Sequence, residues 1–273
     1  MTNQSFVSKI VDRVVDARLS KHTAKHNLIP VFQSAYRTFH LTETAVAGVM
    51  NEMIKAVDQG HVGALMLLDL STAFDSVDHT NLNVVIQRRF GVSGQALGWL
   101  ADFLEDRTQA VRACSREAIS VTLESGVPQS SLLGPKQFIQ YSEDITRVLE
   151  KHALIYHLFA DNTQGMLHGP PADVPRIAST LTNCFTTDVS HWCATKRLQW
   201  NASKTEVLWF GSAVNLSKIS PRDMVCAGAT DVDSTTVVRN LGVMFDTELS
   251  MREHVSRVAQ VFFPLASAAT SWP

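Results

Sequence analysis

Two short apolar runs, residues 154–159 and 163–167, flank the tetrapeptide Phe159-Ala160-Asp161-Asn162. Apolar runs on either side of turn-forming residues predict a β-hairpin, with Asp161 and Asn162 at a turn where both tolerate positive φ. Far upstream, Asp69 follows the apolar run that begins at Val62, which predicts a buried strand. The fold must therefore hold two carboxylates at the ends of buried strands.

The two aspartates predict a metal site if their strands are neighbours. Asp69 and Asp161 would then meet at one sheet edge, where two carboxylates repel each other unless a cation lies between them. Mg²⁺ suits such a pair, because it binds a few carboxylate oxygens and keeps positions for water and substrate phosphates. Taken singly, an Asp at a strand end is more often a turn residue.

The composition indicates a packed globular protein. Hydrophobic residues make up 45% of the 273-residue chain, charged residues make up 18%, and the net charge is −2. The four cysteines form no CxxC pair and have no histidine at zinc-ligand spacing, which predicts reduced thiols. We expect no membrane span, because the apolar runs are short.

Strands and helices are mixed without a regular βαβ rhythm, and hairpins are present. This pattern predicts an α+β fold with a mostly antiparallel sheet. Helices are predicted at 7–19, 42–59, 81–90, 94–104 and 173–196, and strands at 62–70, 121–123, 154–159, 163–167, 204–210 and 237–245. The loop GVPQSSLLGP carries two glycines and two prolines, so a shaped turn is expected there.

Five segments occur in a fixed order along the chain: LLDLSTAFDSVDH, SGVPQSSLLGP, LFADNTQ, LQWNASKTEVLWFG and NLGVMFD. They resemble the successive motifs of reverse transcriptases encoded by non-LTR retrotransposons, which are LINE-type elements, nearest to the jockey-like groups. FVSKIVDRVVDARLS and LIPVFQSAYRTFHLTETA resemble the segments that precede those motifs. The similarity covers almost the whole chain.

The resemblance implies a right-hand polymerase with fingers, a palm built on the antiparallel sheet, and a partial thumb. Residues 1–60 would form the N-terminal part of the fingers. Residues 61–215 would form the palm with interleaved fingers segments, and residues 216–273 the end of the palm and the start of a truncated thumb. A missing thumb predicts weak, salt-sensitive binding of nucleic acid. The endonuclease domain of the family is expected to be absent from this chain.

The resemblance also implies roles for single residues. Asp69 and Asp161 match the metal-binding aspartates, with Mg²⁺ as the expected cofactor. Phe74 matches the aromatic residue that lies under the sugar and excludes a ribose 2′-OH. Gln129 matches a loop residue that helps to hold the template and the incoming nucleotide.

Two cations complete the implied site. Arg37, in QSAYR, matches an arginine expected to bind the triphosphate through paired hydrogen bonds. Lys204 matches a lysine proposed to protonate the leaving pyrophosphate. Structural alternatives stay open: Phe74 as core, Arg37 in a surface ion pair and Lys204 as a solvated turn residue. We expect Asp75, Asp78 and His79 to cap the following helix.

The sequence departs from the family at three places. Asn162 stands where active members carry a second aspartate, so one negative charge is lost and weaker metal binding is expected. Ser130 replaces a glycine, and its side chain projects where the backbone could need positive φ. Lys136, Gln137 and Gln140 occupy positions that are usually apolar.

The leading hypothesis is an RNA-directed DNA polymerase that takes an RNA template, a DNA primer and deoxynucleoside triphosphates, with activity reduced by Asn162. The alternative is a catalytically dead palm-and-fingers module that only binds RNA or a partner. An unrelated two-metal hydrolase would leave the GVPQSSLLGP loop and the Lys204 strand unexplained. The resemblance implies an intracellular protein, in the nucleus or in a cytoplasmic ribonucleoprotein.

Overall fold

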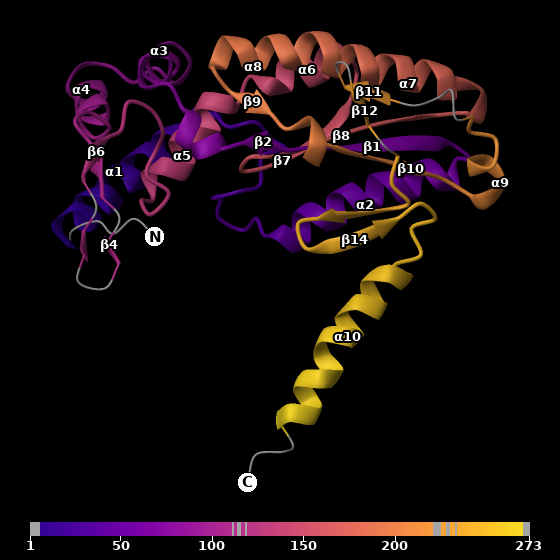
Figure 1. Cartoon of the computed structure of the whole chain (residues 1–273). Coiled ribbons are helices and arrows are strands. Elements are labelled where there is room, and N and C mark those ends of the chain that lie inside the picture. The colour runs from indigo at the N-terminus through magenta and orange to yellow at the C-terminus, as the bar shows by residue number, and fades with distance from the viewer. Residues whose placement is uncertain are drawn as a thin grey trace.

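A four-stranded antiparallel sheet forms the centre of the molecule (Figure 1), as seen in a computed structural model. Its strand order is β10-β1-β8-β7, so the chain does not follow the spatial order of the strands. The strands are β1 (Val62–Leu68), β7 (Ile155–Phe159), β8 (Asn162–Gly169) and β10 (Glu206–Phe210). The structure describes residues 6–110, 112–113, 116–117, 119–220, 225–227, 230–232 and 234–269.

Helices cover both faces of this sheet (Figure 1), which explains why β1 is apolar along its whole length. Side chains alternate along a strand, so Leu65 belongs to the core cluster that contains Met53 of α2, whereas Ala64 belongs to the cluster that contains Ile177 of α7. Gly63 is required for close packing, because a Cβ there would lie 2.3 Å from the Phe210 ring. The bounds are α2 Thr42–Asp58 and α7 Val174–Asn183.

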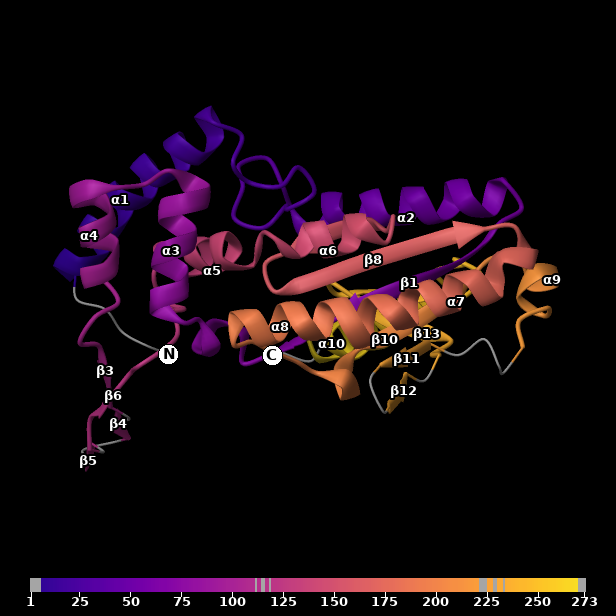
Figure 2. The same cartoon turned by 90° about the horizontal axis from the view of Figure 1, so that it is seen from above.

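A second group of helices lies at one end of the sheet, together with short strand pairs (Figure 2). Buried Asp12 links two of these helices, because its carboxylate accepts hydrogen bonds from the backbone N–H groups of Leu132 and Leu133 at the start of α5. This group contains α1 Phe6–Lys25, α3 His79–Phe90, α4 Gly94–Asp102, α5 Leu133–Ser142, β3 Thr108–Gln109, β4 Arg112–Ala113, β5 Arg116–Glu117 and β6 Val121–Thr122.

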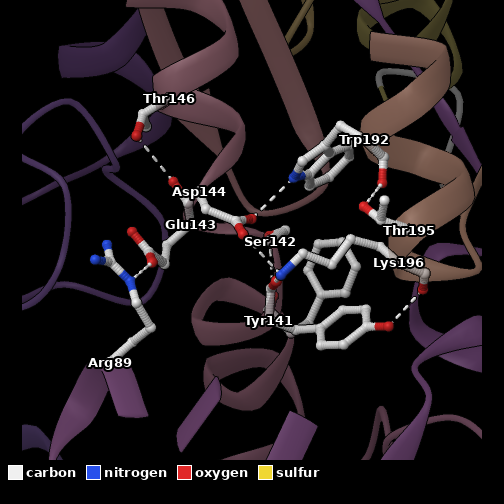
Figure 3. Close-up of polar contacts among 10 residues, drawn as sticks. Arg89, Tyr141, Ser142, Glu143, Asp144, Thr146, Trp192, Thr195 and Lys196 are labelled. Atoms are coloured by element: carbon white, nitrogen blue, oxygen red, sulfur yellow. Dashed lines mark hydrogen bonds and ion pairs between the residues drawn. The ribbon is translucent and has the colours of Figure 1, made fainter. Parts of the chain in front are cut away.

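A polar network joins the junction of α5 and α6 to α8 (Figure 3). Lys196 Nζ lies 2.9 Å from Asp144 Oδ2 and donates to the Tyr141 carbonyl, while Trp192 Nε1 donates to Asp144 Oδ1 at 2.8 Å. The Tyr141 hydroxyl returns a hydrogen bond to the Lys196 carbonyl. The helices are α6 Ile145–Lys151 and α8 Ser190–Lys196.

Several predicted boundaries are wrong. The predicted helix 173–196 contains a π-helical turn, η3 (Cys184–Val189), between α7 and α8. The predicted strand 237–245 is a hairpin of β13 (Val237–Asn240) and β14 (Val243–Asp246), because Leu241 and Gly242 both have positive φ. The predicted loop 126–135 ends in helix α5, and Lys204 lies in the 3₁₀ turn η4 (Ala202–Lys204), ahead of β10.

The remaining elements are short, except for the last helix. Helix α10 contacts β14 and projects away from the body of the molecule (Figure 1), with Val255 and Phe262 exposed. No described helix meets the length and apolarity that a membrane crossing requires. The last helix, α10, spans Arg252–Ala269. The short remaining elements are β2 Leu70–Ser71, η1 Ala73–Ser76, η2 Pro171–Asp173, β9 Gln199–Trp200, α9 Ala213–Leu216, β11 Val225–Ala227 and β12 Thr230–Val232.

The free thiols of Cys184 and Cys193 are buried, which agrees with the expected reduced state, whereas the side chains of Cys114 and Cys226 lie outside the described part.

The division of the chain into fingers, palm and thumb stays a prediction.

Candidate active site

The register of the sheet brings the two acidic positions to one end of adjacent strands. Leu68, the last residue of β1, pairs with Thr163 of β8. Asp69 therefore follows directly at the end where β8 begins with Asn162, and Asp161 precedes Asn162 in the hairpin loop. Positions that are remote in sequence thus converge, as expected for neighbouring strands.

Asp161 lies in a two-residue loop, because Phe159 of β7 pairs with Asn162 of β8. The loop consists of Ala160 and Asp161, and Ala160 carries the positive φ, at 56°. The predicted turn at Asp161 and Asn162 is thus displaced by one residue. The displacement makes Asn162 the first residue of β8.

The two carboxylates interact electrostatically. Burial raises the pKa of Asp161 above its usual value, and the negative charge of Asp69 raises it further, against a lowering by a backbone hydrogen bond. Burial also raises the pKa of Tyr36, with the Asp161 charge as a second cause. Asp161 therefore interacts electrostatically both with Asp69, just after β1, and with Tyr36, in the segment before α2.

The acidic pair has the donor chemistry of a divalent-cation site. Asp69 Oδ2 is buried and accepts no hydrogen bond from any described residue, so it has an unused acceptor position. Its closest ionic partner is Lys204 Nζ, 3.5 Å away, on a lysine side chain that is 68% exposed. Carboxylate and amide oxygens are the hard ligands that Mg²⁺ binds. No cluster of three or more His, Cys, Asp or Glu residues poised for a metal occurs in the described ranges.

Asp69, Asn162 and Lys204 line one cavity of about 180 Å³. The cavity continues between the sheet and the β13–β14 hairpin. Gln164 and Asn240 form part of its wall, and these buried residues exchange two side-chain hydrogen bonds of 2.8 and 2.9 Å, which tie β8 to β13. The other lining residues are Leu67, Leu68, Thr163, Glu206, Arg239 and Leu241.

The loop at residues 126–129 docks on the turn that follows β2. Val127 N donates to Phe74 O at 2.8 Å, and Gln129 Nε2 lies 3.4 Å from Asp75 Oδ1. A Cβ at Gly126 would lie 3.0 Å from the Asp75 backbone, so this approach and the φ of 92° require glycine. The structure thus brings Gln129 to the turn that carries Phe74.

Phe74 is half-buried, and its ring packs on Phe138 of α5 with ring centroids 4.7 Å apart. Phe138 thus anchors the Phe74 ring, while part of the residue stays exposed to solvent. Ser130 is exposed and does not have positive φ, so the expected backbone strain is absent there. The predicted helix cap is present at Asp78, whose Oδ1 accepts from Asn81 N at 2.7 Å, whereas the His79 ring bonds to Gly126 O.

Arg37 lies apart from the Asp69 cavity. Its Nη1 donates to three backbone carbonyls, those of Pro30, Val31 and Gln33, at 3.0 to 3.2 Å. It lines a second cavity, of about 420 Å³, which is enclosed by α1, the segment at residues 27–40 and α5 and shares no lining residue with the first. In this conformation the guanidinium stabilises its own loop.

Sequence reasoning missed Gln33, Gln164 and Asn240. All three are buried, and each makes side-chain hydrogen bonds near the acidic pair. Gln33 belongs to the QSAYR segment, but neither spacing nor residue type indicates its partner. Only the strand pairing of the folded chain shows these contacts.

The comparisons with known proteins agree with this geometry. Residues 1–245 match the family described as "Reverse transcriptase (RNA-dependent DNA polymerase)". The Drosophila melanogaster proteins "Probable RNA-directed DNA polymerase from transposon BS" and "RNA-directed DNA polymerase from mobile element jockey" are each 25% identical over 92% and 94% of this chain. The chain spans 27% of the length of each of these relatives.

Among solved structures, the chain resembles telomerases. The Candida albicans telomerase in complex with a fragment of telomeric RNA has a TM-score of 0.54 at 12% identity, over 88% of this chain and 38% of the telomerase. The apo Candida tropicalis enzyme has a TM-score of 0.51 at 10% identity, over 88% of this chain and 43% of that one. These likenesses show the polymerase fold. The chain therefore belongs to the reverse transcriptase (RNA-dependent DNA polymerase) family.

Proposed function

We propose that this chain carries the nucleotidyl-transfer site of an RNA-directed DNA polymerase, with Asp69 and Asp161 as its metal ligands. The convergence of the two carboxylates at the ends of β1 and β8 supports this proposal most strongly. Reverse transcriptases generally use divalent metals, and the oxygen donors here favour Mg²⁺. Bound Mg²⁺ would polarise the phosphate and lower the pKa of the primer 3′-OH.

The reaction is the attack of the primer 3′-OH on the α-phosphate of a deoxynucleoside triphosphate, with pyrophosphate as the leaving group. The exposed Lys204 ammonium beside Asp69 could reach the leaving group as a proton donor. Phe74, anchored on Phe138, would lie under the sugar and exclude a 2′-OH. Gln129, held near the same turn, would contact the template or the incoming base.

Arg37 would bind the triphosphate only after its guanidinium leaves the three carbonyls that it contacts. The template is proposed to be RNA and the primer DNA, because the family binds RNA templates. We also propose that the protein acts inside the cell, in the nucleus or in a ribonucleoprotein particle.

Asn162 sets the expected level of activity. An amide at the start of β8 supplies a neutral oxygen where a carboxylate would attract the cation, so the unmodified chain should be impaired. Primer extension on an RNA template, with Mg²⁺ varied, tests both statements. We expect Asn162→Asp to raise the rate and to lower the Mg²⁺ requirement.

Asp69→Ala is the matched control in the Asn162→Asp background. It removes one proposed ligand and should reduce extension roughly 10²-fold or more. Equal rates for the unmodified chain and Asn162→Asp would contradict the impairment. Retention of activity by Asp69→Ala would contradict the assignment of the site.

Asn162 also favours a second candidate function, a domain that binds RNA without catalysis. This candidate predicts RNA binding that does not change with Mg²⁺ or with Asp69→Ala. It also predicts no extension even after Asn162→Asp. Binding titrations with and without the metal therefore separate the two functions.

A further inference from the structure

The segment before α2 pairs with the edge strand of the central sheet. Leu158 N of β7 donates to Phe32 O at 2.9 Å, and Ser34 N donates to Leu158 O at 3.0 Å, which makes a parallel bridge between Gln33 and Leu158. This pairing satisfies backbone groups on the exposed edge of β7. It also fixes Gln33 beside the end of the strand that leads to Asp161.

Gln33 is buried, with only 2% of the residue exposed. Its Oε1 accepts two backbone hydrogen bonds, from Ala35 N at 3.0 Å and from Ala160 N at 3.3 Å. The first bond fixes the amide group relative to its own segment. The second holds the residue that immediately precedes Asp161.

Ala160 needs such support, because its φ of 56° places an L-residue with a Cβ in the left-handed region. That conformation costs roughly 1–2 kcal/mol for a residue other than glycine. In a two-residue loop, a change at Ala160 redirects Asp161 as well. A hydrogen bond to the Ala160 N–H therefore acts directly on the direction of the Asp161 carboxylate.

Arg37 stabilises the shape of the segment from the other side. Its donation to the carbonyls of Pro30, Val31 and Gln33 closes this part of the chain into a compact loop. Gln33 thus accepts a hydrogen bond from Arg37 at its backbone carbonyl and another from the Ala160 N–H at its side-chain oxygen. The contacts form a continuous path from Arg37 to the Asp161 loop.

We propose that Gln33 is a positioning residue for Asp161, which it orients by holding the Ala160 N–H. The role in metal binding rests on the proposed function, whereas the contact itself does not. Displacements of about 1 Å at a reacting group can cost 10²-fold in rate, so a single acceptor at this loop matters.

Amide hydrogen exchange of the whole chain, read at single residues by NMR, tests the contact. In Gln33→Met, which keeps the length but removes the acceptor, exchange at Ala160 should accelerate roughly five- to tenfold. Exchange at Leu158 should stay unchanged. Gln33→Asn, one methylene shorter, should give the same result and replaces the Met variant if that variant does not fold.

Ser34→Ala is the matched control. Ser34 is also buried, and its Oγ lies 2.9 Å from His157 Nε2, so it joins the same two segments without reaching the loop. This variant should leave the Ala160 amide as slow as in the unmodified chain. Unchanged exchange at Ala160 in Gln33→Met, or equal acceleration in Ser34→Ala, would overturn the contact.

Mn²⁺ titration followed by electron paramagnetic resonance tests the positioning. Gln33→Met should weaken Mn²⁺ binding by about 10–100-fold, as expected for a residue that orients a metal ligand. Ser34→Ala should change the affinity less than about twofold. An unchanged affinity in Gln33→Met overturns the positioning role. If the unmodified chain binds no Mn²⁺, the proposed metal site fails, and exchange at Ala160 still decides the contact.

Discussion

Asn162 changes the charge at the strand end where Asp69 and Asp161 meet. Two carboxylates remain there, and burial together with the Asp69 charge raises the pKa of Asp161. A cation between them would relieve this repulsion, and a third carboxylate would strengthen its binding. The replacement of one aspartate by asparagine therefore alters affinity more than shape.

Two buried glutamines, Gln137 and Gln164, are expected to affect the free energy of unfolding in opposite directions. Gln137 is 0% exposed, and neither its Nε2 nor its Oε1 has a hydrogen-bond partner among the described residues. Replacing it by methionine, of similar length, removes two unsatisfied polar atoms. We expect Gln137→Met to raise the free energy of unfolding by about 1–2 kcal/mol in urea titrations.

Gln164 is the matched control, because it is equally buried but fully paired with Asn240. Gln164→Met leaves the Asn240 amide without its partner. The free energy of unfolding should fall by about 1–3 kcal/mol. Destabilisation by both substitutions would show that Gln137 has a partner in solution.

At the scale of elements, the network in Figure 3 joins α8 to the junction of α5 and α6. The Lys196 side chain is 9% exposed, and Asp144 is its ionic partner. Asp144→Ala would remove the anionic partner of the ammonium, which would keep the Tyr141 carbonyl and ring, and would also remove the acceptor of Trp192. We expect a loss of roughly 2–3 kcal/mol, measured by urea denaturation.

The exposed pair of Asp173 and Arg176, with side chains 38% and 61% exposed, provides the comparison. Asp173→Ala should cost less than about 1 kcal/mol, because water screens the charges and replaces the contact. A similar loss for both variants would mean that burial of Lys196 does not decide the effect.

The elements that the sequence predicted well have a strong apolar period or clear end signals. β1 begins two residues after Gly60 and runs through an apolar segment, and its predicted and observed starts coincide at Val62. The turns were harder to predict. Ala160 and Leu241 both adopt positive φ, a conformation that neither residue type signals. At Ala160, the Gln33 contact holds the conformation through tertiary structure.

At the scale of the whole molecule, the mixture of strands, hairpins and helices without a regular βαβ rhythm predicted the α+β fold and the mostly antiparallel sheet. The strand order β10-β1-β8-β7 makes β1 and β8 adjacent inner strands, with Asp69 just after the end of β1 and Asp161 just before the start of β8. The pairing of residues 32–34 with β7 could not be predicted, because it joins segments more than a hundred residues apart through backbone groups. Any residue type except proline can supply such bonds.

The central claim is that Asp69 and Asp161 bind one divalent cation together. A crystal structure of the chain soaked with Mn²⁺, with the ion located by anomalous scattering, tests it most directly. We predict an ion with an oxygen of Asp69 and an oxygen of Asp161 both at about 2.1–2.2 Å. An ion bound to only one of them, or density confined to another part of the molecule, would contradict the account.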